Sequence, residues 1–370
     1  MKYKPYNLKD VVKASEQEKF TVVSTFAGGG GSSTGYRLAG GKILCVNEFV
    51  QEAITTYKEN YPSTPILPDD IKKLTAEDFN KYGDIDIFDG SPPCSAFSVS
   101  GAMVQGSHSK GWGQTKTYSD GKKVENIEDL FFEFLRIAKD LKPKVIIGEN
   151  VAGLVAGEAK LKLNEIVNTF EEIGYDVSYK ILNASHFGVP QSRRRVIFIA
   201  VREDVTEAIG LTFMNIQSLF PEESNEVITL EDCLTGIEID REEADTLINK
   251  FVGSAHHVTW LDMPDDSKKV ETGGDYHPKG HFFNMKKCSR FKPSPTITAK
   301  FPPMHWHEPR GLTIKEIKRA MSLPDDFKLT GSYNKQSERC GRMVPPLMMK
   351  AVAQSIYEKV LKPYNEISKV

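Results

Sequence analysis

The sequence predicts an α/β protein built on a doubly wound, mainly parallel sheet, together with a second, smaller and irregular domain. Short apolar strand patterns alternate with amphipathic helix patterns through the first half of the chain, which is typical of βαβ units. The alternation stops after Val201, and Pro, Gly and His are scattered over residues 203–305. Helical patterns return at 313–321 and 346–360. We therefore expect a discontinuous main domain, 1–202 with 306–370, and a second domain at 203–305.

Six strands are expected from apolar runs bounded by polar or turn-forming residues, at 21–27, 43–49, 85–89, 145–149, 177–182 and 195–201. Residues 128–141 and 161–173 carry an apolar stripe at helical spacing. Ligands of open α/β sheets bind beyond the carboxyl ends of the strands. Residues that directly follow a predicted strand are therefore the candidates for function.

Composition describes an ordinary globular chain of 370 residues, with 39% hydrophobic and 26% charged residues. No apolar run reaches the ~20 residues of a membrane span, and the N-terminus lacks a signal-peptide core. The five cysteines are odd in number and form no Cys-x-x-Cys pair, so neither a disulfide framework nor a metal site is predicted. A reducing, cytoplasmic compartment and no membrane partner are expected.

Net charge is −2, but charge is distributed unevenly along the chain. Residues 277–292 hold five Lys or Arg, two His and no acid, whereas 221–245 hold ten Asp or Glu and a single Arg. A basic run is a candidate phosphate-contacting surface. A solvated face with no ligand is the plainer interpretation.

The first predicted strand ends in a run of four glycines at 28–31. Glycine runs let the backbone approach a ligand closely, and this one matches neither the dinucleotide nor the P-loop pattern. A nucleoside without a phosphate chain is therefore plausible, although the turn could simply be tight. Glu48 and Phe49 end the second strand, where a carboxylate suits ribose hydroxyls and a ring suits a purine. With Asp70 they describe an adenosine pocket.

Cys94 follows two prolines just after the third predicted strand. A thiol at this edge is well placed for chemistry, although most free cysteines are small buried hydrophobes. Glu149 ends an apolar strand, where partial burial would raise its pKa and suit an acid near neutral pH; a solvated glutamate is the alternative. Residues 191–195 bring three arginines that suit phosphate or a base carbonyl, or form a surface cluster.

With these segments in this order, the chain resembles the DNA cytosine-5 methyltransferases of bacterial and phage type. The family's hallmark segments run along most of the chain: Phe26-x-Gly28-x-Gly30, Glu48, Asp70-Ile71, Pro93-Cys94, Leu130-Phe131-Phe132, Glu149-Asn150-Val151, Gln191-x-Arg193-x-Arg195, Pro295-Thr296-Ile297 and Gly341-x-x-Val344-Pro345-Pro346. Two departures are Arg342, where the family usually has Asn, and a long insertion at 101–123.

The resemblance implies a Rossmann-like, S-adenosylmethionine-dependent fold that releases S-adenosylhomocysteine, with 203–305 as the target-recognition domain. Cys94 would add to C6 of a flipped-out cytosine in double-stranded DNA, because Cys combines nucleophilicity with accessible ionisation. The catalytic residues implied are Cys94, Glu149, Asn150, Arg193 and Arg195. The cofactor residues implied are Phe26, Ala27, Gly28, Gly30, Glu48, Phe49, Asp70, Ile71, Pro92 and Leu130. The DNA contacts expected are Ser98, Gln191, Arg193, Lys286, Lys287 and Arg290.

The resemblance further implies a monomeric, nucleoid-associated enzyme, either paired with a cognate restriction endonuclease in a restriction-modification system or acting as an orphan. Two alternatives stay open: a tRNA cytosine-5 methyltransferase of the same fold and a non-catalytic DNA-binding homologue. A cofactor-binding oxidoreductase is least consistent with the glycine run.

Overall fold

The computed structural model describes residues 2–93, 116–117, 123–124, 129–157, 159–212, 215–299 and 301–368. Two compact units are formed, each from three separated segments. The sheet unit contains residues 11–182, 194–222 and 349–370, and the second unit contains residues 1–10, 183–193 and 223–348. These boundaries differ from 203–305, the predicted target-recognition domain. The assignment of 203–305 to target recognition concerns function and stays a prediction.

The sheet unit is built on seven strands in the order β3-β2-β1-β4-β7-β9-β8. The strands are β1 (Phe20–Thr25), β2 (Gly41–Asn47), β3 (Ile66–Leu67), β4 (Ile87–Gly90), β7 (Val145–Val151), β8 (Tyr175–Asn183) and β9 (Arg194–Arg202). β1 pairs in parallel with β2 and β4, β2 with β3, and β4 with β7, whereas β9 runs antiparallel to β7. The prediction of a mainly parallel sheet is confirmed, and all six expected strands are present.

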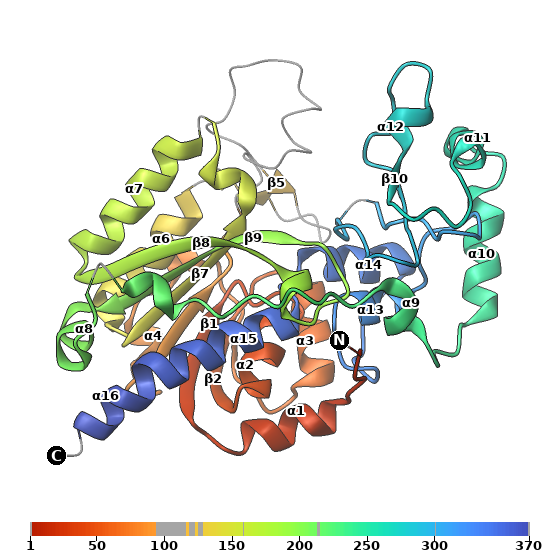
Figure 1. The fold of residues 1–370 in the computed structure, drawn as a ribbon. Coiled ribbons are helices and arrows are strands. Elements are labelled where there is room, and N and C mark those ends of the chain that lie inside the picture. The colour runs from red at the N-terminus through yellow and green to blue at the C-terminus, as the bar shows by residue number, and fades with distance from the viewer. Residues whose placement is uncertain are drawn as a thin grey trace. The chain divides into compact units, whose positions relative to one another are not determined.

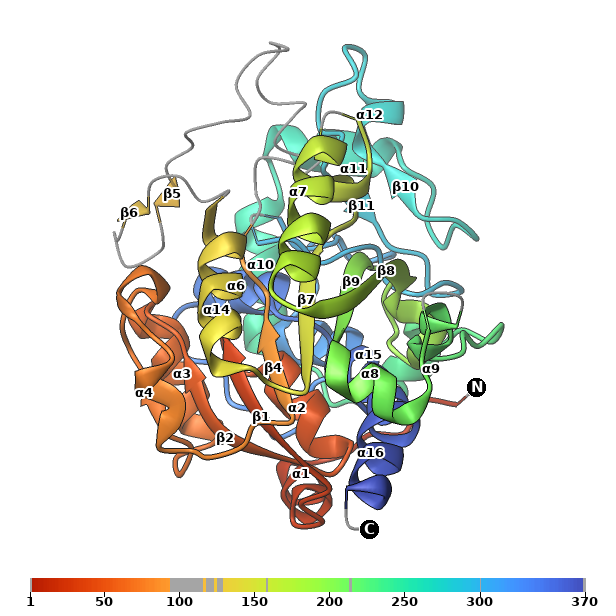
Figure 2. The same cartoon turned by 90° about the vertical axis from the view of Figure 1, so that its left-hand side faces the viewer.

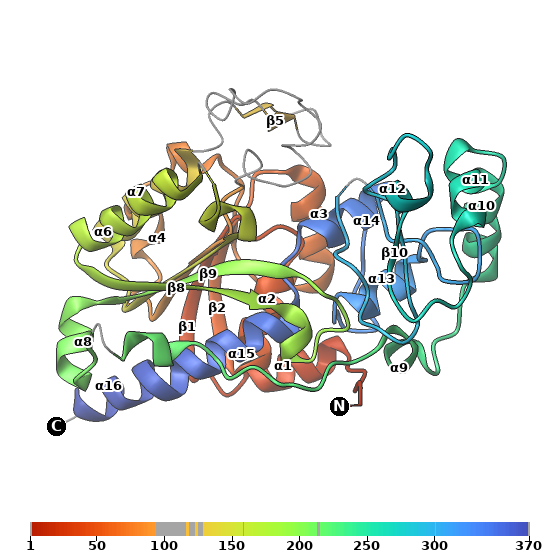
Figure 3. The same cartoon turned by 45° about the horizontal axis from the view of Figure 1, so that its top comes forward.

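Helices cover both faces of this sheet (Figure 1). α6 (Leu130–Leu141) and α7 (Ala159–Glu172) lie side by side on one face (Figure 2). α15 (Pro346–Ile356) and α16 (Lys362–Ile367), joined by the π-helical turn η7 (Tyr357–Leu361), run along the other (Figure 3). Apolar side chains of α6 and α7 form one core with those of the strands. The sheet is therefore doubly wound, as predicted.

The remaining helices of the sheet unit are α2 (Gly31–Leu38), α3 (Gln51–Asn60), the short α4 (Glu77–Asn80) and α8 (Glu203–Ile209), with α1 (Leu8–Ser15) at its start. Single turns of 3-10 helix lie at η1 (Ile71–Lys73), η4 (Ala152–Val155) and η6 (Ile216–Leu219). The described parts of 94–128 include the two-residue strands β5 (Lys116–Thr117) and β6 (Lys123–Val124).

The pairing of β1 with β4 leaves no room for a side chain at Gly90. A Cβ atom there would lie 2.7 Å from the Phe134 ring of α6 and 2.8 Å from Thr25 Oγ1. Phe134 also stacks on Phe88 of β4, with ring centroids 4.8 Å apart. The glycine therefore lets α6 close over the strand ends from which the candidate functional loops leave.

The second unit is less irregular than expected. It contains α9 (Leu230–Leu234), α10 (Arg241–Phe251), α11 (Ala255–Asp262), α12 (Gly273–Tyr276), α13 (Ile314–Ala320) and α14 (Tyr333–Arg342), with the antiparallel pair β10 (Glu271–Thr272) and β11 (Lys286–Lys287) and the turn η5 (Ala184–Phe187). A small apolar cluster joins Trp260, Met263, Met285 and Met304. The expectation of irregular chain over 203–305 is wrong for α8, α10 and α11. Polar residues dominate α8 and α10, and α11 has only a weak helical period.

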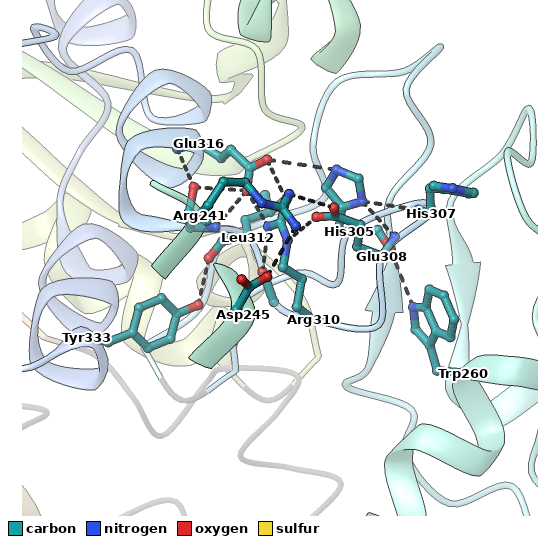
Figure 4. Close-up of polar contacts among 12 residues, drawn as sticks. Arg241, Asp245, Trp260, His305, His307, Glu308, Arg310, Leu312, Glu316 and Tyr333 are labelled. Atoms are coloured by element: carbon teal, nitrogen blue, oxygen red, sulfur yellow. Dashed lines mark hydrogen bonds and ion pairs between the residues drawn. The ribbon is translucent and has the colours of Figure 1, made fainter. Parts of the chain in front are cut away.

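A buried ion pair organises the loop that leads into α13 (Figure 4). The Arg310 guanidinium, whose side chain is 1% exposed, donates to both carboxylate oxygens of Glu316 at 2.7 and 3.1 Å and to Glu308 at 2.5 Å. Burial opposes ionisation of Glu308, yet its bonds from Arg241 and Arg310 lower its pKa to about 2. A fork of donors that satisfies two carboxylates is the geometry in which a buried arginine is tolerated.

His305 belongs to the same network. Its Nδ1 accepts from the backbone N–H groups of His307 and Glu308 at 3.2 and 3.0 Å. Burial, reinforced by Arg310, lowers the pKa of His305 to about 4. The imidazole is thus held neutral, and residues 305–310 form a turn fixed from inside.

Gly90→Ala is expected to lower the free energy of unfolding by about 1–3 kcal/mol, because overpacking forces neighbouring groups off their rotamers. Urea denaturation measures it. Adding Phe134→Leu should relieve part of the clash, so the double variant should lose less than the sum of the two single losses. An alanine variant with the wild-type midpoint would contradict the close packing.

Candidate functional site

A cleft lies beyond the carboxyl ends of β1 and β2. Six predicted cofactor residues line it: Phe26, Glu48, Phe49, Asp70, Ile71 and Leu130. Asn47 also lines it and was not predicted. Its amide donates to the carbonyls of Leu67 and Asp69 at 3.0 and 2.8 Å. Its place directly before Glu48, at a strand end, was the available clue.

Glu48 is fixed by backbone groups on either side of the cleft. Its Oε2 accepts from Gly28 N–H and its Oε1 from Val50 N–H, both at 2.8 Å. Gly28 has φ +55° and no atom within 4 Å of the position a Cβ would take. The cleft therefore combines an oriented carboxylate with two rings (Phe26 and Phe49), and the Gly28 backbone that holds the carboxylate is open. This donor and acceptor set fits a ribose with an attached base.

Gly28 and three other predicted cofactor residues are not among the residues that line this cleft. Ala27 is buried and donates its N–H to the Asn47 carbonyl at 3.1 Å. Gly30 has φ +103°, and a Cβ there would meet the rings of Tyr57 and Tyr61 at 3.2–3.3 Å. Pro92 is buried after β4. These three shape the loops around the cleft.

An acid and a guanidinium meet across β7 and β9. Glu149 Oε1 lies 2.9 Å from Arg195 Nε, and the two side chains are 10% and 14% exposed. Antiparallel pairing brings the strands together, with Val151 opposite Arg195. Burial lowers the pKa of Arg195, and the carboxylate opposes that change. The contact fixes the position of the Glu149 side chain at the ligand edge.

Asn150 links this strand to the turn after β4. Its amide nitrogen donates to the Pro92 carbonyl at 3.2 Å, and its carbonyl oxygen accepts from Val151 N–H at 2.8 Å. Cys94 and Ser98, which follow that turn in the sequence, lie outside the described residues. Their predicted positions at the edge stay predictions.

Gln191 and Arg193 were predicted to contact the DNA or the reacting base. In the structure they hold two distant segments of the second unit together by hydrogen bonds, an arrangement called here the clasp. Arg193 donates to the carbonyls of Ile297 and Gly341 at 3.1 and 2.9 Å. Gln191 accepts from Ile297 N–H at 3.2 Å. A Cβ at Gly341 would lie 2.4 Å from the Thr298 backbone, so the glycine allows this approach. Three hallmark segments of the sequence thus meet at one place.

The predicted DNA-contacting cations differ in their surroundings. Lys287 is 1% exposed, donates to Asp265 at 2.8 Å and lies 3.8 Å from the Trp260 ring centroid. Arg290 is 36% exposed and pairs with Glu231 and Asp266. Lys286 donates to Thr272 at 2.7 Å, and burial lowers its pKa. Lys286 and Arg290 are partly exposed, whereas Lys287 serves the interior of the unit.

Four cysteines lie within the described ranges, Cys45, Cys233, Cys288 and Cys340, and all are buried. Burial raises the pKa of Cys45 and of Cys340 to about 12 and raises the pKa of the other two thiols as well. Thiols of this kind are poor nucleophiles.

Within the described part of the chain, no group of His, Cys, Asp or Glu side chains is arranged to hold a metal ion. None of the described helices is long and apolar enough to cross a membrane.

A doubly wound sheet with a cleft of aromatic and acidic side chains after its first two strands is the architecture of Rossmann-like, S-adenosylmethionine-dependent methyltransferases. The chain belongs to one family of this class: the profile of the C-5 cytosine-specific DNA methylases matches residues 20–358. The protein is therefore a DNA cytosine-5 methyltransferase that uses S-adenosylmethionine and acts on DNA. The tRNA-directed and non-catalytic alternatives are not favoured.

Similarity to individual proteins extends over nearly the whole chain. The chain is 30% identical over 349 residues to the type II methyltransferase M1.HphI of Haemophilus parahaemolyticus, covering 91% of this chain and 86% of the relative. It is 29% identical over 354 residues to M.Eco47II of Escherichia coli, covering 91% and 78%.

Two solved structures share the fold. A putative DNA modification methyltransferase encoded within a prophage of E. coli superposes with a TM-score of 0.68 at 20% identity, covering 93% of this chain and 99% of that one. The Dnmt2 methyltransferase of S. pombe superposes with a TM-score of 0.58 at 17% identity, covering 94% and 99%.

Arg193→Lys is expected to lower the free energy of unfolding by about 1.5–3 kcal/mol, because a lysine cannot reach two carbonyls with a planar fork and leaves one of them buried without a donor. Chemical denaturation measures the change. Arg194→Lys is the matched control, since its side chain is exposed. Equal stability of the two variants would contradict the clasp.

Proposed function

We propose that this enzyme methylates C5 of a cytosine flipped out of a specific duplex DNA sequence, through a covalent bond between Cys94 and C6. The observation that carries the proposal is the cleft of six predicted cofactor residues at the edge that also holds Glu149 and Arg195. Pro93 and Cys94, one of the segments by which the chain resembles this family, follow β4 in the sequence.

The chemistry explains the residue types. The Cys94 thiolate adds its electron pair to C6 of cytosine, which gives C5 the character of an enamine carbon. C5 then forms a bond to the methyl group. Loss of the C5 proton and departure of the thiolate restore the aromatic ring. S-adenosylmethionine, when bound, supplies a methyl group on a sulfonium centre and leaves as S-adenosylhomocysteine.

Cys94 is the cysteine best suited to attack. The four cysteines within the described ranges are buried with raised thiol pKa values, so none is an accessible thiolate. Sequence places Cys94 one residue after Pro93, beyond the end of β4. Asn150, by holding the Pro92 carbonyl, would orient the turn that leads to it.

Glu149 would hold cytosine N3 and supply or retain a proton there while the thiolate adds to C6. Arg195, 2.9 Å from the carboxylate, would orient it and contact the base carbonyl. Since Arg193 donates to two backbone carbonyls, we propose that Arg193 and Gln191 act on DNA through the loops they hold.

The cleft would take the adenosine half of the methyl donor. Glu48, oriented by Gly28 and Val50 N–H groups, would accept from the ribose hydroxyls. Phe49 and Ile71 would contact the two faces of the adenine, and Asp70 would accept from its amino group. Phe26 and Leu130 would close the remaining walls.

Residues 203–305 would contact the DNA, with Lys286 and Arg290 near phosphates and Ser98 beside the flipped base. The similarity to type II methyltransferases supports a modification enzyme of a restriction-modification system, with an orphan enzyme as the alternative. We propose a cytoplasmic, nucleoid-associated monomer. Bisulfite sequencing of DNA from cells expressing the chain would identify the DNA sequence and the modified cytosine together.

DNA carrying 5-fluorocytosine at the target should trap the enzyme, because fluorine cannot leave C5 as a proton does. With S-adenosylmethionine present, the wild type is expected to form an adduct that survives denaturing electrophoresis, and Cys94→Ala should form none. Cys340→Ala, which removes a buried thiol, should still form it. An adduct that persists in Cys94→Ala would reassign the nucleophile.

Glu149→Gln and Glu48→Gln should separate chemistry from cofactor binding. Loss of a general acid typically lowers the rate by ~100- to 10,000-fold, so Glu149→Gln is expected to slow single-turnover methylation with little change in S-adenosylmethionine affinity. Glu48→Gln should mainly weaken that affinity. Calorimetry and rapid-quench assays measure the two effects. Near-normal turnover of Glu149→Gln would reduce Glu149 to a scaffold role.

A further inference from the structure

The carboxylate of Asp89, in β4, has no role in the chemistry described so far. Its residue is 0% exposed. Ser24 Oγ of β1 donates to Oδ2 at 2.6 Å, and the Tyr36 hydroxyl of α2 donates to Oδ1 at 2.8 Å. Thr25 Oγ1 donates to the Asp89 backbone carbonyl at 3.0 Å. One buried residue thus joins three elements by side-chain bonds.

The place of this residue in the sheet is informative. Ser24 and Asp89 are register partners on the adjacent parallel strands β1 and β4. The strand order reverses here, since β2 and β3 lie on one side of β1 and the later strands lie beyond β4. The loop that lines the cofactor cleft begins at Phe26, directly after Ser24 and Thr25. Five residues after Asp89 comes Cys94.

We propose that Asp89 is a positioning residue for methyl transfer. Its carboxylate holds the end of β4, which leads to Cys94, against the end of β1 and against α2, the two elements on either side of the cofactor loop. This role rests on the proposed function, because it is the reaction of Cys94 with a bound methyl donor that needs the two strand ends in fixed relation. Misplacement of reacting groups by about 1 Å can cost ~100-fold in rate.

Burying a carboxylate is costly, which argues against a merely structural choice of residue. Burial raises the pKa of Asp89 to about 7, opposed by the bonds from Ser24 and Tyr36 and reinforced by the charge of Glu149. The titratable groups that act on it are Tyr36 on α2 and Glu149 on β7. β1 presents hydroxyls only. An apolar residue would avoid this cost at the same packing volume.

The same two strands carry a natural control at their opposite ends. The Asp86 carboxylate, just before β4, accepts from Thr21 N–H at 2.8 Å and from Thr21 Oγ1 at 3.1 Å. This is again a carboxylate–hydroxyl link between β1 and β4. It lies at the amino ends of the strands, away from the cofactor cleft.

The experiment compares Asp89→Asn with Asp86→Asn. We expect Asp89→Asn to slow single-turnover methylation of unmethylated plasmid DNA by roughly 10- to 100-fold at saturating S-adenosylmethionine, with cofactor affinity nearly unchanged. Asp86→Asn should retain most of the rate. Tyr36→Phe, which removes one donor, should show a smaller loss and keeps the test open if Asp89→Asn does not fold.

The pH dependence adds a readout that a structural role would not move. The wild-type rate should rise with pH through about 7, where Asp89 ionises, and Asp89→Asn should lack that inflection. Because the folded pKa is raised, the contribution of Asp89 to stability is full below the unfolded pKa of 3.8 and is lost as pH rises through about 7. The melting temperature of Asp89→Asn should therefore fall less steeply than that of the wild type as pH rises from 3.8 to about 7.

Two results would overturn the proposal: a wild-type rate and pH profile in Asp89→Asn and Tyr36→Phe, or an equal loss of rate in Asp86→Asn. A wild type that methylates no DNA would overturn the proposed function and this role with it. An active wild type with indifferent Asp89 variants would overturn the role alone.

Discussion

The parallel pairing of β1 with β4 decides where the functional elements of the sheet unit lie. Their carboxyl ends are neighbours, yet the chain leaves each in a different direction, toward the glycine run after β1 and toward Pro92 and Pro93 after β4. Gly90 makes this closeness sterically possible, and the Ser24–Asp89 bond makes it specific. A crevice at such a reversal of strand order is where open α/β sheets bind ligands, and the cleft that Phe26 and Glu48 line lies next to it, beyond the carboxyl ends of β1 and β2.

Buried charge is handled in the same way in both units. Three buried ionic groups of the described residues meet oppositely charged partners: Glu149 with Arg195, Arg310 with Glu316, and Lys287 with Asp265. Pairs of this kind add little net stability compared with apolar packing, but removing one partner is costly. They therefore fix geometry more than they hold the chain together. A fixed geometry suits an enzyme in which a nucleophile, a cytosine and a methyl donor must meet.

Sequence patterns predicted the sheet well because its strands are apolar runs that end in recognisable turns, and they predicted most of the cleft because strand ends converge. They missed β3, two residues long, which depends on its neighbour β2. They also missed α10, whose polar face dominates its composition. The burial of Arg193 and Lys287 was not predictable from local sequence, since their partners are distant: Gly341 lies 148 residues after Arg193, and Met263 lies 24 residues before Lys287.

That separation has a consequence for synthesis of the protein. The Arg193 side chain donates to the carbonyls of residues 297 and 341, so the clasp is incomplete until residue 341 has left the ribosome. At about 5–20 residues per second, residue 341 follows Arg193 by roughly 7–30 s. Throughout that interval the guanidinium has water in place of both carbonyls, and a chain released early never acquires them. The clasp in the second unit therefore forms only after residue 341 has been synthesised.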